Sequence, residues 1–366
     1  MFELEFFPVG EGARAGDAIC TRYVVDDGFR VLIVDGGTDA SGEAMVDHIR
    51  RHYGEHQVVH DVVLTHPDGD HSSGLRQVLR GLPVRRLWLH GLWHHAAEMV
   101  SLFQNPSWTP TGLAQAIRDE YPVIAELLDI AHERGIDVQE PFAGQRIGAF
   151  TVLSPSRPRY LHLVPQFRKT PDPRKEVLEE RGIWVQPRRI FSKLLEAALA
   201  KMIAEGWFNE TLREGGKTSS ENESSVVLLG HFGQEKVLLT GDAGCLALGW
   251  AMDYADASGL DRRNLTVVQV PHHGSRNNVS PSILNRLLGP IRSPDSPSHS
   301  IAIASVPKDD STHPRRVVAN AFRRRGFPVR KTQGVHYRVH SGGMPDRGSI
   351  PNAVPLPFFD EVEEYT

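Results

Sequence analysis

Cysteine and long apolar runs are both scarce in this chain. Only Cys20 and Cys245 occur among 366 residues, far apart in the sequence, so a disulfide framework is excluded and we expect a reducing, cytoplasmic setting. No segment approaches the roughly 18 consecutive apolar residues that a membrane-spanning helix needs, so we expect no membrane contact. The opening MFELEFFPVGEG contains acids but no basic residue, so we expect no secretory signal.

Charge of one sign is not in large excess either. The formal net charge is −4, which gives no global attraction to nucleic acid or to acidic membranes. With 40% hydrophobic and 23% charged residues, the composition is that of an ordinary globular protein that can bury a large core. We therefore treat residues 1–366 as a single domain.

Short apolar runs bounded by glycine, aspartate or asparagine indicate strands, and longer runs with helical spacing indicate helices. The predicted strands are 2–9, 17–25, 31–35, 61–65, 85–89, 149–154, 225–230, 236–240, 266–270 and 301–306. The predicted helices are 42–54, 113–135, 188–206 and 314–326. Because strands and helices are interleaved, the pattern predicts α/β layers rather than an all-β sandwich.

Two segments interrupt this alternation. Residues 93–140 are mainly helical, and residues 156–222 begin with a stretch rich in proline and arginine. Between Arg157 and Lys201, 11 lysines and arginines outnumber five acids. We interpret 156–222 as a basic, helical insertion whose residues 157–201 could lie along a nucleic-acid backbone, although such runs are usually only solvated.

Four predicted strands end in side chains that can bind a metal ion. VLIV leads to Asp35, DVVLT to His66, KVLLTG to Asp242, and TVVQVP to His272 and His273. In layered sheets, loops at one edge bring together residues from distant parts of the chain. Four such endings predict a single site at that edge.

The segment THPDGDH (65–71) is the strongest of these motifs. Its metal-capable side chains are His66, Asp68, Asp70 and His71. Gly69 permits a tight backbone that can point several side chains at one centre, and imidazole nitrogen with carboxylate oxygen suits zinc, manganese or iron. The plain alternative is a polar turn, because aspartate, histidine and glycine are all common in turns.

The other two motifs are weaker when taken alone. TGD (240–242) could be an ordinary turn, and a lone histidine is more often a satisfied surface or core residue than a ligand. HHGS (272–275) gains weight from two consecutive histidines before a glycine at a strand end. Together the three motifs predict a metal centre.

In this order, and with the early LIVDGG, the motifs HPDGDH, LLTGD and VPHHGS resemble the metallo-β-lactamase superfamily of metallohydrolases. The similarity is greatest to the soluble metallohydrolase domain of bacterial DNA-uptake competence proteins, through GDAI (16–19), ERGIDVQEPFAGQRIGAFTVLSPS (133–156), NESSVVLL (222–229) and SVPKDDSTHP (305–314). It covers roughly 1–92, 124–156 and 222–335, outside the basic insertion. The resemblance implies a four-layer αββα sandwich and one or two divalent ions, zinc or manganese, that activate water.

Carried over by position, the resemblance also implies a ligand set. It assigns His66 and Asp68 to a first ion, Asp70, His71 and His273 to a second, and Asp242 to a bridge between them. It further implies that Asp70 accepts a hydrogen bond from the attacking water and that Asp35 orients the ligands from outside their shell.

The chain departs from the commoner HxHxDH pattern at Asp68, where a carboxylate favours manganese or magnesium over zinc. The usual third histidine of the first site is not evident. Segment 225–240 is typical of a hairpin whose two ends share an edge, so Asn222 could take that place. Either of His272 and His273 can be the ligand; we prefer His273 and give His272 an outer role.

Other histidines, arginines and cysteines have alternative interpretations. His313, in DDSTHP, can donate a proton or hold a phosphate oxygen, or it can simply start a helix before Pro314. The remaining groups are His90, His94 and His95 (interpreted as surface or rim residues), Arg323, Arg324 and Arg325 (a solvated helix end), and the two cysteines (core residues).

A two-metal site can hydrolyse lactones, thioesters or phosphodiesters, and the fold does not choose among them. The carboxylate at Asp68, the resemblance to a branch associated with DNA degradation and the basic stretch 157–201 favour a phosphodiesterase or nuclease. In such an enzyme, metal-bound hydroxide would attack the phosphorus atom in line with the leaving oxygen. The alternatives are a hydrolase of a lactone, thioester or cyclic nucleotide, and an interaction module with an idle site. The sequence identifies no protein partner.

Overall fold

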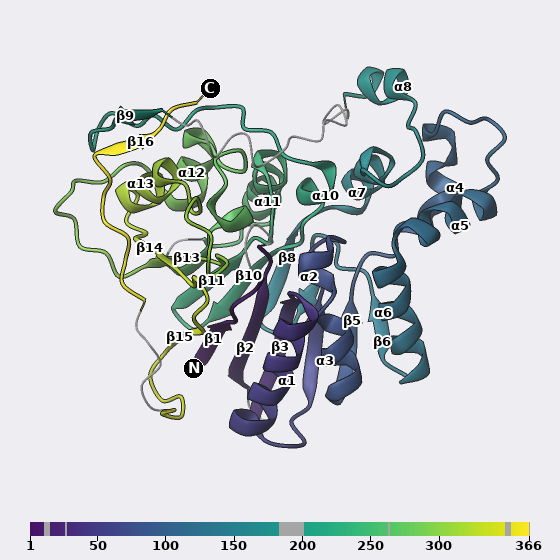
Figure 1. The fold of residues 1–366 in the computed structure, drawn as a ribbon, viewed down its shortest axis with the longest axis horizontal. Coiled ribbons are helices and arrows are strands. Elements are labelled where there is room, and N and C mark those ends of the chain that lie inside the picture. Colours follow the sequence, from purple (N-terminus) through teal and green to yellow (C-terminus); the bar gives the residue numbers. More distant parts are fainter. Residues whose placement is uncertain (11–14, 26–27, 183–200, 263, 348–352, 366) are drawn as a thin grey trace.

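Two large β-sheets dominate the computed structural model, which describes residues 1–10, 15–25, 28–182, 201–262, 264–347 and 353–365 (Figure 1). The first sheet has the order β15 (Tyr337–His340), β1 (Phe2–Phe6), β2 (Ala18–Val25), β3 (Gly28–Gly36), β4 (Val59–Val63), β5 (Val84–Trp88), β6 (Asp137–Gln139). The second has the order β14 (Val329–Lys331), β13 (Ile301–Ala304), β12 (Leu265–Gln269), β11 (Glu235–Leu239), β10 (Val227–Phe232), β8 (Phe150–Ser154), β7 (Arg146–Ile147). Strands β9 (Met202–Ala204) and β16 (Glu361–Glu363) form a separate pair.

Helices lie outside both sheets and in the connections between them (Figure 1). The α-helices are α1 (Asp39–Tyr53), α2 (Gly69–Ser72), α3 (Leu75–Gly81), α4 (Ala96–Met99), α5 (Pro110–Glu120), α6 (Pro122–Glu133), α7 (Arg157–Leu163), α8 (Lys175–Glu180), α10 (Ser220–Glu223), α11 (Cys245–Ala257), α12 (Pro281–Leu288) and α13 (Arg316–Arg324). The 3-10 turns are η1 (Leu92–His95), η2 (Val100–Leu102), η3 (Val164–Gln166) and η4 (Pro271–Gly274).

Three apolar cores separate four layers. Side chains alternate along a strand, so in β3 Ile33 packs toward α1, α3 and α6, whereas Leu32 packs toward the second sheet. The central core joins β3 to Phe150 of β8 and Val267 of β12. The third core packs the other face of the second sheet against α11, α12 and α13, with Phe322 fully buried. The architecture is therefore the predicted α/β fold with an αββα order of layers.

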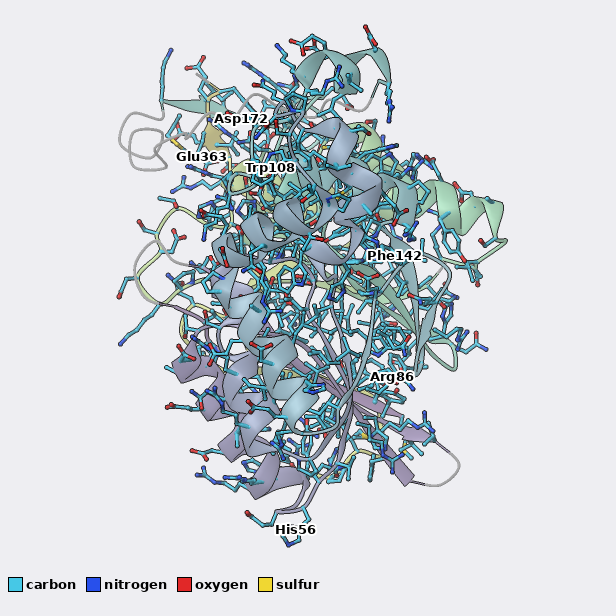
Figure 2. The ribbon with its side chains drawn as sticks, turned by 90° about the vertical axis from the view of Figure 1, so that its right-hand side faces the viewer. His56, Arg86, Trp108, Phe142, Asp172 and Glu363 are labelled. Carbon is cyan, nitrogen blue, oxygen red and sulfur yellow. The ribbon has the colours of Figure 1, made fainter. Side chains whose placement is uncertain are left out.

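Parallel strands in both sheets gather their carboxyl ends at one end of the molecule. Strands β3, β4, β5 and β6 are parallel, as are β11, β12, β13 and β14. The two sets of loops touch, because the backbone N–H of Val226 donates to the carbonyl of Thr65 at 3.0 Å. Figure 2 shows His56, in the loop that enters β4, at the opposite end from Trp108 and Asp172, so the helical segment and the insertion flank the loop end.

The ten predicted strands correspond to β1–β5, β8 and β10–β13, and helices 42–54 and 314–326 correspond to α1 and α13. Helix 113–135 is instead two helices, α5 and α6, because Pro122 lacks an N–H and restricts the residue before it. Of the predicted helix 188–206, residues 188–200 lie outside the described part. Residues 202–204 form β9, so the helix was wrong there.

Arg324 and Arg325 are fully buried, so the prediction of a solvated helix end was wrong for both. Segment 205–210 covers them. Arg325 donates to both carboxylate oxygens of Glu210 at 2.8 and 2.9 Å, and Arg324 donates to the carbonyl of Trp207 at 2.6 Å. The local sequence around the two arginines does not indicate their burial, because their partners lie about a hundred residues away in the chain.

The predicted rim position was also wrong for His90 and His95, which are buried. The rings of His90 and Tyr160 are stacked with their centroids 4.1 Å apart. Nε2 of His95 lies 2.9 Å from Oε2 of Glu140. Of the two cysteines, which are both free, Cys20 is buried but Cys245 is only half-buried. Among the described helices, none has the length and apolar character needed to cross a bilayer.

Candidate metal centre

Five buried or half-buried side chains converge where the loops of the two sheets meet. They are His66 after β4, His71 in α2, Asp242 after β11, and His272 and His273 in η4 after β12. They form two triplets that share Asp242, one with His66 and His71 and the other with His272 and His273, and within each triplet the ligand atoms all lie within 4.8 Å of one another. We call these the first and the second triplet.

Asp242 lies between four imidazole nitrogens. Its Oδ2 is 3.8 Å from Nε2 of His66 and 3.6 Å from Nε2 of His272. Its Oδ1 is 3.6 Å from Nε2 of His71 and 3.7 Å from Nε2 of His273. Each carboxylate oxygen of Asp242 thus faces one histidine of each triplet, so this carboxylate lies within reach of all four imidazoles.

Three donor atoms in this cluster lack hydrogen-bond partners among the described residues. Nε2 of His66, Nε2 of His71 and Oδ1 of Asp242 are buried without a hydrogen-bond partner among the described residues. An unpartnered buried polar atom costs about 1–3 kcal/mol, so a chain keeps several together only where something binds them. Burial alone would raise the pKa of Asp242, but His272, His71 and His273 hold that pKa well below its usual value, so the carboxylate is ionised. The residues therefore fit a divalent metal ion.

Outer contacts fix the orientation of two of these imidazoles. Nδ1 of His71 lies 2.8 Å from Oδ2 of Asp35, and Asp35 also accepts hydrogen bonds from the N–H and hydroxyl of Thr65 at 2.7 and 2.6 Å. Nδ1 of His273 lies 2.9 Å from the carbonyl oxygen of Ser305. Because Nδ1 faces an acceptor oxygen in each case, Nε2 is the nitrogen turned toward Asp242.

The HHGS turn has a strained backbone. His272 and His273 have φ values of 46° and 58°, in the left-handed region that side chains other than glycine seldom occupy. Gly274 follows with φ 90°, and a Cβ there would lie 2.2 Å from Cβ of Pro314, so this position requires glycine. The strain places both imidazoles on Asp242, and tight packing against the loop of His313 holds the turn in place.

Asn222, expected as a possible metal ligand, lies behind His272. Its Nδ2 is 2.8 Å from Nδ1 of His272 and 2.9 Å from the hydroxyl of Thr218. Oδ1 of Asn278 is 3.0 Å from the same imidazole nitrogen. In the structure, Asn222 thus orients His272, and His272 joins the second triplet on equal terms with His273.

Asp68 and Asp70 are in neither triplet. Asp68 accepts two hydrogen bonds from Nη2 of Arg168, at 2.8 and 2.7 Å, and its Oδ2 lies 4.0 Å from Nε2 of His66. Asp70 starts α2 next to Gly69 and is half-buried. The triplets thus group His66 with His71, whereas Oδ1 of Asp242 faces both His71 and His273, the pairing that the resemblance implies.

Asp17 is a residue that the sequence reasoning did not single out. Its side chain is buried, both carboxylate oxygens lack hydrogen-bond partners among the described residues, and Oδ2 lies 3.8 Å from Nδ1 of His71. Burial raises the pKa of Asp17 to about 7. The available signal was an acid between glycine and the apolar run AIC, a poor place for an ordinary surface carboxylate.

His313 lies in the loop that packs on Gly274. Its Nδ1 is 2.8 Å from Oδ2 of Asp310, which leaves Nε2 as the nitrogen able to carry or release a proton, and its side chain is 24% exposed. A half-buried, oriented imidazole in the loop that packs on the HHGS turn is suited to proton transfer.

Comparison with known proteins agrees with the fold. Residues 15–150 match the family model of the metallo-beta-lactamase superfamily, a segment that contains His66 and His71 but not Asp242, His272 or His273. No curated protein sequence matches this chain.

Three solved structures are similar in fold. Zn²⁺-bound PqqB of Methylobacterium extorquens is 13% identical, with 92% of this chain and 99% of that chain covered and a TM-score of 0.39. CmlA of Streptomyces venezuelae, a diiron β-hydroxylase, is 10% identical, with 93% and 54% covered and a TM-score of 0.43. A long-form RNase Z of yeast is 11% identical, with 73% and 32% covered and a TM-score of 0.29. These likenesses concern the fold alone.

Proposed function

We propose that this protein is a metal-dependent hydrolase that cleaves phosphodiesters. The observation that carries the proposal is the pair of triplets sharing Asp242, in which three buried donor atoms have no hydrogen-bond partner among the described residues. Two adjacent divalent ions supply Lewis acidity and lower the pKa of water, which is the chemistry that phosphodiester hydrolysis needs.

The protein's own residues would hold and orient this centre. His66, His71 and Asp242 would bind one ion, and Asp242, His272 and His273 the other. Asp35 holds His71 and the carbonyl of Ser305 holds His273, so their Nε2 atoms need no rearrangement to bind. Nε2 of His313, oriented through Asp310, would supply a proton to the leaving oxygen.

The donor set favours zinc over manganese. Four imidazoles and one carboxylate make a softer set than a site rich in carboxylates. Asp68, the residue that would make the first site harder, is hydrogen-bonded to Arg168 in the structure.

Two free cysteines suit a reducing compartment such as the cytoplasm.

Nucleic acid is the phosphodiester that the basic stretch 157–201 favours, although residues 183–200 lie outside the described part. Within the described part, Arg157 forms an ion pair with Glu98, and Arg168 pairs with Asp68 and Glu221. The charge for binding a nucleic-acid backbone would then come mainly from the other basic residues of the stretch. The substitutions Arg188→Glu with Arg189→Glu should weaken DNA binding and spare hydrolysis of a small phosphodiester.

The proposal is tested by metal analysis and hydrolysis with one set of proteins. The parent, Asp242→Asn and the control Asp309→Asn, an exposed carboxylate, are loaded with zinc or manganese. Each is then incubated with bis(p-nitrophenyl) phosphate, single-stranded and duplex DNA, and RNA. We expect the parent and the control to bind metal and hydrolyse at least one of these, and Asp242→Asn to lose both properties.

Other outcomes would indicate other functions. Metal binding without cleavage of any phosphodiester, but with hydrolysis of a lactone or thioester, would identify a small-molecule hydrolase. A parent protein that binds no metal would leave an interaction module with an idle site.

A further inference from the structure

Arg168 connects the basic insertion to the loop that carries His66 and His71. Its Nη2 donates to the two carboxylate oxygens of Asp68, at 2.8 and 2.7 Å. Its Nε and its backbone N–H donate to Oε1 of Glu221, at 3.0 and 2.6 Å. Asp68 lies between His66 and His71, and Glu221 adjoins Asn222, which contacts His272. The guanidinium therefore joins the loop of the first triplet to α10, whose Asn222 contacts His272 of the second triplet.

The side chain of Arg168 is 56% exposed, although the side chain of Glu221 is 2% exposed and that of Asp68 26%. The hydrogen bonds to these acids use Nε and Nη2, and Nη1 has no hydrogen-bond partner among the described residues. Oδ2 of Asp68 is 4.0 Å from Nε2 of His66, so a single carboxylate separates the guanidinium from the first triplet. A half-exposed guanidinium held by two acids thus lies one carboxylate away from the first triplet.

We propose that Arg168 is the residue that binds the anionic oxygens of the substrate, a phosphoryl group, beside the first triplet. This rests on the proposed phosphodiesterase function. A guanidinium matches phosphate oxygens with directed donors and stays charged at every working pH. Asp68 and Glu221 hold it in one position, which reduces the entropy lost when an anion binds. Each divalent ion bound by the triplets adds positive charge beside Asp68, which further favours an anion.

A purely structural role would look different. Arg168 would then only fasten the insertion to the domain, and its loss would lower stability and disturb the metal ligands through Asp68 and Glu221. Anion binding instead predicts a change in affinity for phosphate and in KM at constant metal content, with little change in kcat. These readouts separate the two roles.

The test uses the full chain as the parent, Arg168→Met, Arg168→Lys and the control Arg181→Met, which removes an exposed arginine of the same insertion. Thermal unfolding and metal content per chain are measured first. Calorimetry on the zinc-loaded proteins then gives the affinity for inorganic phosphate, and kcat and KM are measured with bis(p-nitrophenyl) phosphate.

We expect Arg168→Met to weaken phosphate binding and raise KM about 10- to 100-fold, the value of a charged hydrogen bond, with metal content unchanged. Arg168→Lys should recover part of the loss, and Arg181→Met should equal the parent. Equal phosphate affinity in Arg168→Met and the parent, or loss of metal from both Arg168 variants, would overturn the proposal. If the parent hydrolyses the substrate but all proteins bind phosphate equally well, the hydrolase function is kept and the role of Arg168 is rejected. If phosphate binding depends on Arg168 but the parent hydrolyses nothing, the role of Arg168 is kept and the hydrolase function is rejected.

Discussion

Nδ1 of His71 lies 2.8 Å from Oδ2 of Asp35, at the carboxyl end of β3. Asp35 itself is fully buried, has φ 57° and accepts two further hydrogen bonds from Thr65. One residue thus ties the end of β3 to the loop after β4 and fixes the tautomer of a histidine in the first triplet. The position of Nε2 of His71 is therefore set by the sheet rather than by a flexible loop.

Asp35→Asn should weaken metal binding while the fold is kept. Asparagine tolerates the left-handed backbone, but it offers one acceptor oxygen where Asp35 uses two, so either His71 or Thr65 loses its partner. We expect a 10- to 100-fold loss of zinc affinity, typical for the outer partner of a ligating histidine. Titration against a chelating dye measures it, with Asp39→Asn as the control; unchanged affinity would show that Asp35 does not orient the ligand.

The grouping into two triplets makes a distinct prediction for metal content. His66→Gln and His272→Gln should each lower the zinc content by about one ion per chain, and Asp242→Asn should abolish binding of both ions. Each substitution leaves a site with fewer than the three protein ligands that zinc sites in proteins keep. Elemental analysis after dialysis gives the counts. His56→Gln, at the far end of the molecule, should keep the parent's content. If instead His66 and Asp68 prove to hold one ion while His71 holds the other, the two triplets are not the metal sites.

The sequence predicted which strands end at the centre because strand ends are marked locally by apolar runs followed by polar residues. His66, His71, Asp242 and His273 all lie in such endings, and the structure brings them together with His272. The layers could be predicted for the same reason, since alternation within each run tells which face of a strand is buried.

Contacts between residues far apart in the chain could not be predicted. Arg168 meets Asp68 across 100 positions, and nothing near either residue marks the other as its partner. Asp17 gave only the weak signal of an acid before an apolar run. Which histidines share a site depends on the direction of each ring, and that is decided by outer partners such as Asp35 and Ser305.

We expect that α2 can pack in its place only if residue 16 is glycine, whereas residue 69 tolerates a side chain. A Cβ at Gly16 would lie 1.8 Å from the carbonyl oxygen of Asp70, whereas a Cβ at Gly69 would find only the hydroxyl of Ser73, at 3.7 Å. Gly16→Ala should therefore cost about 1–3 kcal/mol by overpacking and displace His71. Gly69→Ala should be neutral or stabilise α2 by up to about 1 kcal/mol.

Chemical denaturation measures the free energy of unfolding of both variants and the parent, and zinc titration measures their metal affinity. A destabilised Gly69→Ala beside an unaffected Gly16→Ala would contradict the packing that places α2, and would restore the tight turn at Gly69 that the sequence suggested.

Glu223 should make the stability fall as the pH rises toward neutrality. Burial raises the pKa of Glu223 to about 7, against the opposing effect of backbone N–H groups at the start of α11, among them that of Ala247 at 2.7 Å. Below the unfolded value of 4.5 the carboxyl is protonated in both states. Between that value and about 7 it ionises only in the unfolded chain, so the free energy of unfolding decreases by about 3 kcal/mol and then levels off.

Glu223→Gln is the matched variant, because its carbonyl can accept the same bond from Ala247 and it does not titrate. Urea unfolding at pH 5, 6, 7 and 8 should show that the parent loses about 1 kcal/mol more per pH unit than the variant between pH 5 and pH 7, and that this difference levels off by pH 8. Identical pH profiles would mean that Glu223 is already ionised in the folded protein at pH 5. In that case the N–H groups of α11 outweigh the desolvation of the carboxylate, and the start of α11 is an anion site rather than a neutral cap.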